Sequence, residues 1–272
     1  MLSVIVPASN EASYIGACLS HLCASDARGV QIIVVANGCH DATADVARAT
    51  LAEHLPDDWT STVLDLPQGS KPIALNSGDA EAAYKTRVYL DADVTVSPHL
   101  LSALAKVLAT NLPRYASGTP VIPRAQSAVT RAYTRFWKIL PFNQTVAPGY
   151  GLFAVNATGR ARWGTFPQII ADDTFVRLQF MPEDRVQVPE TYDWPMIEGF
   201  SALTRVRRRQ DAGGRQLQSL FPDLMAREGK PPLTASLLAR LILSDPIGFA
   251  TYSAVSLAVR MKRGGSGFTR GR

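Results

Sequence analysis

The first 95 residues alternate between short apolar runs and amphipathic stretches, and this alternation restricts the fold more than any other feature of the chain. Apolar runs with the length and composition of buried strands cover residues 2–6, 31–36, 62–66 and 87–94. Between them, helices are expected over residues 14–22, where the apolar spacing gives one face, over an alanine-rich stretch from after Thr43 to about residue 55, and over residues 73–84. Such alternation predicts an α/β fold whose parallel sheet is covered by helices on both faces.

Polar side chains directly follow three of the predicted strands: Asn10 and Glu11 after the first, Asn37 and Asp41 after the second, Asp91 and Asp93 after the fourth. Ligands of parallel sheets bind beyond the carboxyl ends of the strands, so these clusters are expected to converge on one edge. Helix capping explains any one cluster equally well, and Ser9 or Asn10 is expected to cap the first helix.

The pair Asp91 and Asp93 is the strongest candidate site. Alternate residues of an extended chain point the same way, so both carboxylates are expected to be presented together. Hard oxygen ligands suit a divalent cation that also holds a phosphate, and the alternative is that both aspartates only start a turn. Lys71 and Asn76, which open the third helix, complete the pattern of a nucleoside-diphosphate site. The glycine fingerprints of the Rossmann site and of the phosphate-binding loop are absent.

Four motifs resemble, in order and spacing, the family 2 glycosyltransferases of the GT-A fold: Val4–Glu11, Val34–Thr43, Lys71 with Ala74–Gly78, and Leu90–Asp93. The resemblance implies a three-layer α/β/α fold with a central mixed, mostly parallel sheet and a C-terminal helical segment. It also implies an inverting transferase that binds a nucleotide-diphosphate sugar with Mg²⁺ or Mn²⁺. One departure is Cys39-His40, where the family commonly has Ser-Thr or similar residues.

Carried over position by position, the resemblance assigns nucleotide-sugar binding to Pro7, Asn10, Glu11, Asn37, Asp41, Lys71, Asn76, Asp91 and Ala92. Glu11 and Asp41 would contact the base or ribose, and Lys71 would lie near the phosphates. Asp93 would be the principal metal ligand, with Asp91 beside it.

A second pair of carboxylates, Asp172 and Asp173, precedes an apolar stretch and is expected to open a helix. Carboxylates in a first helical turn are favourable for the helix dipole alone. The functional interpretation is that inversion at a sugar carbon needs a base for the acceptor's proton. The pair resembles the Glu-Asp pair of the family, so Asp173 is expected to be the base and Asp172 its catalytic neighbour. Asp172 stands where the family has glutamate, and its side chain is shorter.

Further elements are expected in the second half: helices over residues 98–110 and 127–140, and a strand opened by glycines over residues 148–155. The Gln-x-x-Arg-Trp signature of processive synthases is absent, which argues for transfer of one sugar per encounter.

Positive charge gathers late in the chain. Residues 205–272 hold 13 Lys and Arg against 4 Asp and Glu, whereas the preceding residues hold 15 against 19. This predicts an anionic partner for the tail. Arg207 and Arg208 are expected on the phosphates of the nucleotide sugar, or else on a solvated helix face. Nucleic acid is not expected, because zinc-finger spacing and aromatic–basic interleaving are absent.

Two apolar helices are expected over residues 233–243 and 246–262, with basic residues at their end. Residues 233–263 therefore predict contact with a membrane surface, the alternatives being a helix that closes the core and a homodimer contact. The expected domains are a catalytic domain over 1–215, with a nucleotide-sugar half over 1–95 and an acceptor half over 96–215, and a basic helical extension over 216–272 with a frayed tail.

The expected function is transfer of a single sugar to a hydroxyl of a saccharide or lipid-linked acceptor, in polysaccharide or glycolipid assembly. Three cysteines and the lack of a signal peptide predict a cytoplasmic protein. Peripheral association with the inner face of the cytoplasmic membrane is compatible with this prediction. A haloacid-dehalogenase-like phosphatase using Asp91 as nucleophile is an alternative, but there the motif ends the first strand of the fold. A non-catalytic nucleotide-sugar-binding protein is the second alternative.

Overall fold

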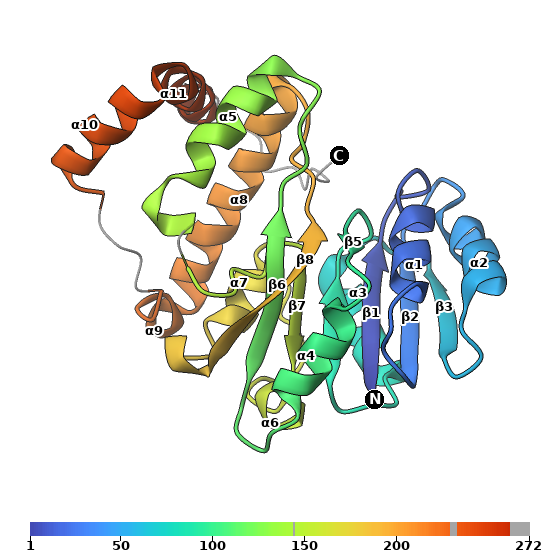
Figure 1. Cartoon of the computed structure of the whole chain (residues 1–272). Coiled ribbons are helices and arrows are strands. Elements are labelled where there is room, and N and C mark those ends of the chain that lie inside the picture. Colours follow the sequence, from blue (N-terminus) through green and yellow to red (C-terminus); the bar gives the residue numbers. More distant parts are fainter. Residues whose placement is uncertain (144, 229–232, 262–272) are drawn as a thin grey trace. The chain divides into compact units, whose positions relative to one another are not determined.

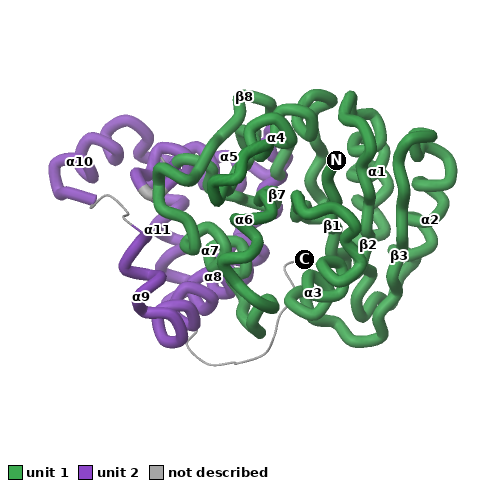
Figure 2. Tube along the Cα trace, turned by 90° about the horizontal axis from the view of Figure 1, so that it is seen from below, with its two compact units in different colours: residues 1–121, 146–194 green, residues 122–145, 195–272 purple. Residues whose placement is uncertain are grey.

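The computed structural model describes residues 1–143, 145–228 and 233–261 (Figure 1). The chain divides into two compact units (Figure 2): unit 1 comprises residues 1–121 and 146–194, and unit 2 comprises residues 122–145 and 195–272. The predicted boundary at residue 215 falls inside one continuous helix, α8 (Phe200–Leu220). The predicted frayed tail lies outside the described residues.

In the described residues of unit 1, eight strands form one sheet in the order β3-β2-β1-β4-β7-β6-β8-β5. Their bounds are β1 (Leu2–Ala8), β2 (Val30–Asn37), β3 (Thr60–Leu66), β4 (Arg87–Leu90), β5 (Thr95–Val96), β6 (Tyr115–Val121), β7 (Leu152–Val155) and β8 (Arg185–Asp193). The first four strands run parallel, β7 runs antiparallel to both of its neighbours, and β8 is parallel to β6 and antiparallel to β5. The predicted mixed, mostly parallel sheet is confirmed.

Helices cover both faces of this sheet (Figure 1). Val4 and Val6 of β1 share a buried cluster with residues of α1 (Ile15–Cys23), α2 (Thr43–His54) and α4 (Leu100–Leu108). The intervening Ile5 points to the other face, where it packs so closely on Gly78 of α3 (Lys71–Glu81) that a Cβ there would come within 2.5 Å of it. All residues of β1 and β2 are buried, as a doubly covered parallel sheet requires. The predicted three-layer architecture is thus confirmed.

Several predicted boundaries were wrong at residues where the chain turns. β4 ends at Leu90, because the N–H of Val94 donates to the carbonyl of Asp91 and closes a turn over residues 91–94. Asp91 and Asp93 therefore lie in a turn and not, as predicted, at alternate positions of an extended strand. Neither Ser9 nor Asn10 caps the first helix, which starts at Ile15 without a side-chain cap. The third helix spans Lys71–Glu81 rather than residues 73–84.

Strands β5, β6 and β8 have no counterpart in the predicted elements. β6 contains Gly118 and Pro120, and β8 contains Pro189. Glycine and proline are unfavourable inside strands, so the sequence pattern did not indicate strands here. Residues 148–151 form a turn before β7 instead of its first half. Unit 1 also contains the short helices α6 (Ala157–Arg160) and α7 (Asp172–Arg177), and α7 is opened by the two aspartates as predicted.

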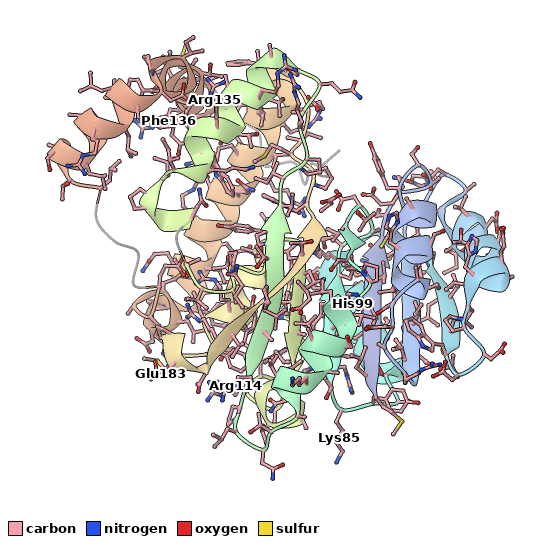
Figure 3. All side chains as sticks on the ribbon, viewed as in Figure 1. Lys85, His99, Arg114, Arg135, Phe136 and Glu183 are labelled. Atoms are coloured by element: carbon pink, nitrogen blue, oxygen red, sulfur yellow. The ribbon has the colours of Figure 1, made fainter. Side chains whose placement is uncertain are left out.

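Unit 2 is helical in its described residues. It contains α5 (Ala128–Lys138), α8, α9 (Pro222–Met225), α10 (Ala235–Ser244) and α11 (Pro246–Met261). Tyr133 of α5 stacks on Tyr252 of α11, with ring centroids 5.3 Å apart. Phe136 of the same helix, labelled in Figure 3, packs with Leu241 of α10. No single described helix has the length and apolarity of a membrane span, although α10 and α11, bent by 116° at their junction, pass that test as a pair.

Candidate functional site

The loops after β1 and β2 are tied together by polar side chains. Asn10 has a φ of 57°, and its Oδ1 accepts from the N–H of His40 at 2.7 Å. Asp41 accepts from the N–H of Ala12 at 3.2 Å and from the hydroxyl of Thr43. Partial burial would raise the pKa of Asp41, but these hydrogen bonds outweigh it and lower the pKa. The predicted convergence of the two clusters is therefore present.

Asn37 links the carboxyl ends of β1 and β2 to the start of α3. Its buried side chain donates to the carbonyl of Ala8 at 2.8 Å and accepts from the N–H of Ser70 at 3.0 Å. The following Gly38 has a φ of 57°, and a Cβ there would lie 2.4 Å from the backbone nitrogen of Gly69. This linkage holds the start of α3, and with it Lys71, next to the ends of β1 and β2.

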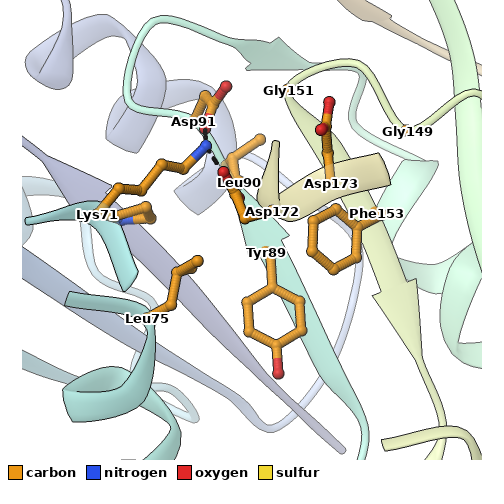
Figure 4. Close-up of a pocket in the computed structure, with 11 residues that line it drawn as sticks. Lys71, Leu75, Tyr89, Leu90, Asp91, Gly149, Gly151, Phe153, Asp172 and Asp173 are labelled. Atoms are coloured by element: carbon orange, nitrogen blue, oxygen red, sulfur yellow. Dashed lines mark hydrogen bonds and ion pairs between the residues drawn. The ribbon is translucent and has the colours of Figure 1, made fainter. Parts of the chain in front are cut away.

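Lys71 is the centre of the site (Figure 4). Its Nζ lies 2.9 Å from Oδ1 of Asp91, at the end of β4, and 3.2 Å from Oδ2 of Asp172, at the start of α7. Burial disfavours the ammonium ion, but the charges of Asp172 and Asp91 outweigh that effect and raise the pKa of Lys71. One cation thus connects the two pairs of carboxylates that the sequence singled out separately.

Asp172 and Asp173 occupy different environments although they are adjacent. Asp172 is 4% exposed, and burial raises its pKa to about 6 even though Lys71 opposes the shift. Asp173 is half-buried and lines the same pocket as Asp91, Gly149 and Gly151. Figure 4 shows its carboxylate pointing away from Lys71, on the side of the two glycines. Asp173 is therefore the carboxylate of the pair with access to a ligand.

The carboxylates that follow β4 are oxygen donors of the kind that a divalent cation binds together with a ligand. In the described parts of the chain, no three His, Cys, Asp or Glu side chains form a closed metal cage. Asp91 and Asp93 flank one turn, and their charges further raise the pKa of the nearby Cys18 thiol, which burial already raises. Mg²⁺ is commonly held by one or two carboxylates plus phosphate oxygens, which matches this pair.

Two glycines of the segment before β7 line this pocket. Gly149 and Gly151 have φ values of 75° and 67°, and Cβ atoms there would clash with Tyr115 and with Val94 and Trp194. The carbonyl of Gly151 accepts from the N–H of Asp91 at 2.8 Å, because β7 runs antiparallel to β4. Between them, Tyr150 stacks on Trp194, with ring centroids 5.0 Å apart. This aromatic pair was not predicted as part of the site.

Asp79, which was not predicted as a site residue, fixes the elements beneath the pocket. Its carboxylate accepts from Arg160 at 2.8 and 3.0 Å, from Tyr89 at 2.8 Å and from Arg87 at 3.3 Å. These partners come from α6 and β4, between 8 and 81 residues away in the chain. No local pattern connects them, so the sequence gives no signal of this cluster.

The remaining predicted residues occupy varied positions. Pro7 lines the pocket, and Ala92 is buried. Asn76 exchanges two hydrogen bonds with the backbone of Phe166, at 2.7 and 3.1 Å, which anchors the loop before α7. The backbone N–H of Glu11 donates to Thr43. The structure assigns none of these side chains a ligand, so their nucleotide-binding roles stay predictions.

Arg207 and Arg208 belong to unit 2. Arg207 donates to Asp211 at 2.9 Å and to Tyr252 at 3.0 Å, and its interactions with these partners raise its pKa against the effect of burial. Arg208 donates to the last carbonyls of α11. These contacts stabilise unit 2, and the predicted contact of both arginines with phosphate stays a prediction.

Comparison with known proteins places this geometry among sugar-transferring enzymes. A family model described as Glycosyl transferase family 2 matches residues 3–163. A search of curated proteins finds no match. Among solved structures, the mannosyltransferase PcManGT from Pyrobaculum calidifontis, in complex with GDP-Man and Mn²⁺, is 21% identical, with a TM-score of 0.64 over 97% of this chain and 76% of that chain.

Two other solved structures are similar at lower identity. TarS 1-349 from S. aureus in complex with UDP-GlcNAc is 13% identical, with a TM-score of 0.54 over 96% of this chain and 91% of that one. Glucosyl-3-phosphoglycerate synthase from Mycobacterium tuberculosis, with Mn²⁺, UDP-Glc and phosphoglyceric acid, is 16% identical, with a TM-score of 0.55 over 85% and 81%. At these identities the likeness is one of fold.

Proposed function

Because the chain belongs to the family 2 glycosyltransferases, and so transfers a sugar from a nucleotide-sugar donor, we propose that it moves one sugar per encounter with inversion at the anomeric carbon. The acceptor is a hydroxyl of a saccharide or a lipid-linked saccharide, in polysaccharide or glycolipid assembly. The observation that carries the proposal is Lys71, which joins Asp91 to Asp172 beside the open carboxylate of Asp173. Family membership excludes the phosphatase and the non-catalytic binding protein.

Lys71 and Asp91 would contribute to binding the diphosphate of the donor. The ammonium group of Lys71 lies 2.9 Å from the carboxylate of Asp91. A phosphate oxygen that is bound next to Asp91 would therefore contact Lys71. Asp93, with Asp91, would hold Mg²⁺ or Mn²⁺, which when bound neutralises charge on the diphosphate. Asp172 keeps Lys71 in place from the opposite side, at 3.2 Å. It is therefore a positioning residue.

Asp173 would act as the base. The acceptor oxygen attacks the anomeric carbon and forms the new glycosidic bond while the bond from that carbon to the diphosphate oxygen breaks. The electron pair of the broken bond leaves with the nucleoside diphosphate, and the acceptor's proton passes to the carboxylate of Asp173. Attack on the side opposite the leaving group inverts the configuration. Gly149 and Gly151 line the pocket beside Asp173, where the acceptor would bind.

The related structures support a nucleotide-diphosphate donor but differ in its identity. They contain GDP-Man, UDP-GlcNAc and UDP-Glc, two of them together with Mn²⁺. We therefore assign this chain a nucleotide-diphosphate sugar and Mg²⁺ or Mn²⁺ as cofactor. Glu11 and Asp41, on the linked loops after β1 and β2, are the proposed contacts of the base or ribose.

A thermal-unfolding series tests this function. Unfolding would be followed with UDP, GDP, CDP and dTDP, each with and without Mn²⁺. One diphosphate, at about 100 times its dissociation constant, should raise the free energy of unfolding by roughly 2.7 kcal/mol when metal is present. Asp93→Ala should lose the metal-dependent part of the shift, whereas Asp57→Ala, at an exposed loop position, should keep it.

Two results would contradict the proposal. One is an unchanged melting temperature with every diphosphate and metal. The other is a metal-dependent shift in Asp93→Ala that equals that of the parent protein.

A further inference from the structure

Helix α11 is apolar on two opposite faces. Gly248, Tyr252, Val255 and Val259 recur every three or four residues and face α5 and α8, where Val255 is fully buried. The opposite face is exposed, and its residues follow the same spacing: Ile247, Ala250, Ala254, Leu257 and Met261. The exposed fractions of Ile247, Leu257 and Met261 are 68%, 59% and 75%. A helix of a water-soluble unit normally carries polar residues on such a face.

Helix α10 extends this surface at the corner that joins it to α11. Leu243, four residues before Ile247, is 84% exposed, the highest value among the exposed large apolar residues of the described chain. We call Leu243, Ile247, Ala250, Ala254, Leu257 and Met261 the α10–α11 face. Several large apolar residues exposed close together in the chain indicate a site of interaction.

The unit that carries the α10–α11 face is strongly basic. Unit 2 holds 17 Lys and Arg against 5 Asp and Glu, a net charge of +12, whereas unit 1 holds 11 against 18, a net charge of −7. Arg240 of α10 and Arg260 of α11 are exposed. Asp245 is the only acidic residue in positions 229–272 of the sequence, and its carboxylate is bound by Arg135 through two hydrogen bonds of 2.9 Å.

The dimensions of the helices favour a position along a membrane surface. With a rise of about 1.5 Å per residue, α10 and α11 are roughly 15 and 24 Å long, less than the hydrocarbon core of about 30 Å. One face of α11 is already packed against α5 and α8, so lipid cannot surround it. An apolar face flanked by arginines is typical of helices that lie in the headgroup region.

We propose that the α10–α11 face binds the surface of an anionic lipid bilayer, with its apolar side chains among the upper acyl chains and Arg240 and Arg260 against lipid phosphates. A second copy of the chain is the competing occupant. A symmetric dimer through this face would bring two units of charge +12 together, and such juxtaposition of like charges is unfavourable. The lipid surface supplies the opposite charge.

Vesicle sedimentation with the full chain tests the proposal. The protein should bind phosphatidylcholine vesicles that contain phosphatidylglycerol, bind pure phosphatidylcholine vesicles far more weakly, and dissociate as salt is added. Ile247→Gln with Leu257→Gln should abolish binding. Arg240→Gln with Arg260→Gln should weaken it about fivefold for each charge removed, or about 25-fold together.

The matched control is Leu112→Gln, which makes the same change at a residue of unit 1 that is 65% exposed. It should bind vesicles like the parent protein, and circular dichroism should show that all variants are folded. Unchanged vesicle binding in Ile247→Gln with Leu257→Gln would overturn the proposal. So would an absence of vesicle binding combined with a dimer, seen by analytical ultracentrifugation, that this double variant dissociates.

Discussion

Two adjacent carboxylates at the start of α7 show how burial separates the roles of neighbouring residues. Asp172 is buried against Lys71, and Asp173 reaches the pocket. Both are aspartates, so their side chains alone do not distinguish them. Their neighbours do, because one carboxylate is occupied by a protein cation and the other faces space for a ligand.

Asp173→Asn should therefore abolish transfer while donor binding persists. The amide has nearly the same shape but cannot accept the acceptor's proton, and loss of a general base typically costs about 10²–10⁴-fold in rate. Measuring kcat and the dissociation constant of the nucleoside diphosphate separates the two effects. A variant with full kcat would refute the assignment of Asp173 as base.

Asp172→Asn should affect stability and pH dependence as well as activity. Burial raises the pKa of Asp172 to about 6, so its stabilising contribution is greatest below the unfolded value near 4 and is lost as pH rises through about 6. The neutral amide avoids the burial of a charge. Between pH 5 and pH 7 the parent should therefore lose more stability than the variant, by an amount on the order of 1 kcal/mol.

The same variant should raise KM for the donor more than it lowers kcat, because Lys71 loses one of its two anionic partners. Urea unfolding at several pH values, combined with steady-state kinetics, tests both effects. Asp57→Asn, at an exposed loop position, serves as the control. A stability difference that is independent of pH would contradict the role given to burial.

At the scale of elements, ion pairs and amide side chains fix the positions of helix and strand ends. Asn37 connects β1, β2 and the start of α3, and Asp79 connects α3, β4 and α6. In unit 2, Asp245 connects the N-terminus of α11 to α5. It accepts from Arg135 and from the N–H of Gly248 at 3.0 Å. Figure 3 labels Arg135 on α5.

Asp245→Asn should reduce the acid sensitivity of unit 2. Arg135 lowers the pKa of Asp245, so the charged pair stabilises the fold above the unfolded pKa near 4, and this contribution is lost as pH falls through the lowered value. Asparagine still caps a helix, so the substitution removes mainly the charge. Since Arg135 is 59% exposed, the expected loss near neutral pH is only about 0.2–1 kcal/mol.

Urea unfolding as a function of pH measures this effect. The difference between variant and parent should be largest above about pH 5 and shrink as pH falls below the unfolded value near 4. Asp57→Asn should show no such trend. A difference that grew on acidification would mean that the ion pair is not its source.

At the scale of the whole molecule, the candidate site lies entirely in unit 1, and the four tryptophans allow a direct test. Trp59, Trp163 and Trp194 belong to unit 1, and Trp137 belongs to unit 2. In Trp137→Phe, tryptophan fluorescence therefore reports on unit 1 alone. The preferred diphosphate with Mn²⁺ should stabilise this fluorescence transition by roughly 2.7 kcal/mol at about 100 times its dissociation constant.

Replacement of Trp59, Trp163 and Trp194 by phenylalanine provides the reciprocal variant, in which fluorescence reports on unit 2. Stabilisation that is detected by Trp137 but is absent from the unit 1 fluorescence would contradict the placement of the site.

The sequence by itself determined the alternation of strands and helices, the three-layer fold and the family, because these depend on local periodicity and on short motifs with fixed spacing. It also predicted that the loops after β1 and β2 converge, because the carboxyl ends of parallel strands share an edge. The start of α7 at Asp172 and the separate helices α10 and α11 were equally visible in the apolar spacing.

Only the tertiary structure decided how distant residues pair. Lys71 lies 20 residues from Asp91 and 101 from Asp172, and the partners of Asp79 lie up to 81 residues away, so no local pattern records these contacts. Turns at residues 91–94 and 148–151, and the strands β6 and β8 with their glycine and prolines, also depend on sheet pairing. The exposed face of α11 is the last example: periodicity shows that the helix is apolar, and only packing decides which of its apolar faces remains in contact with solvent.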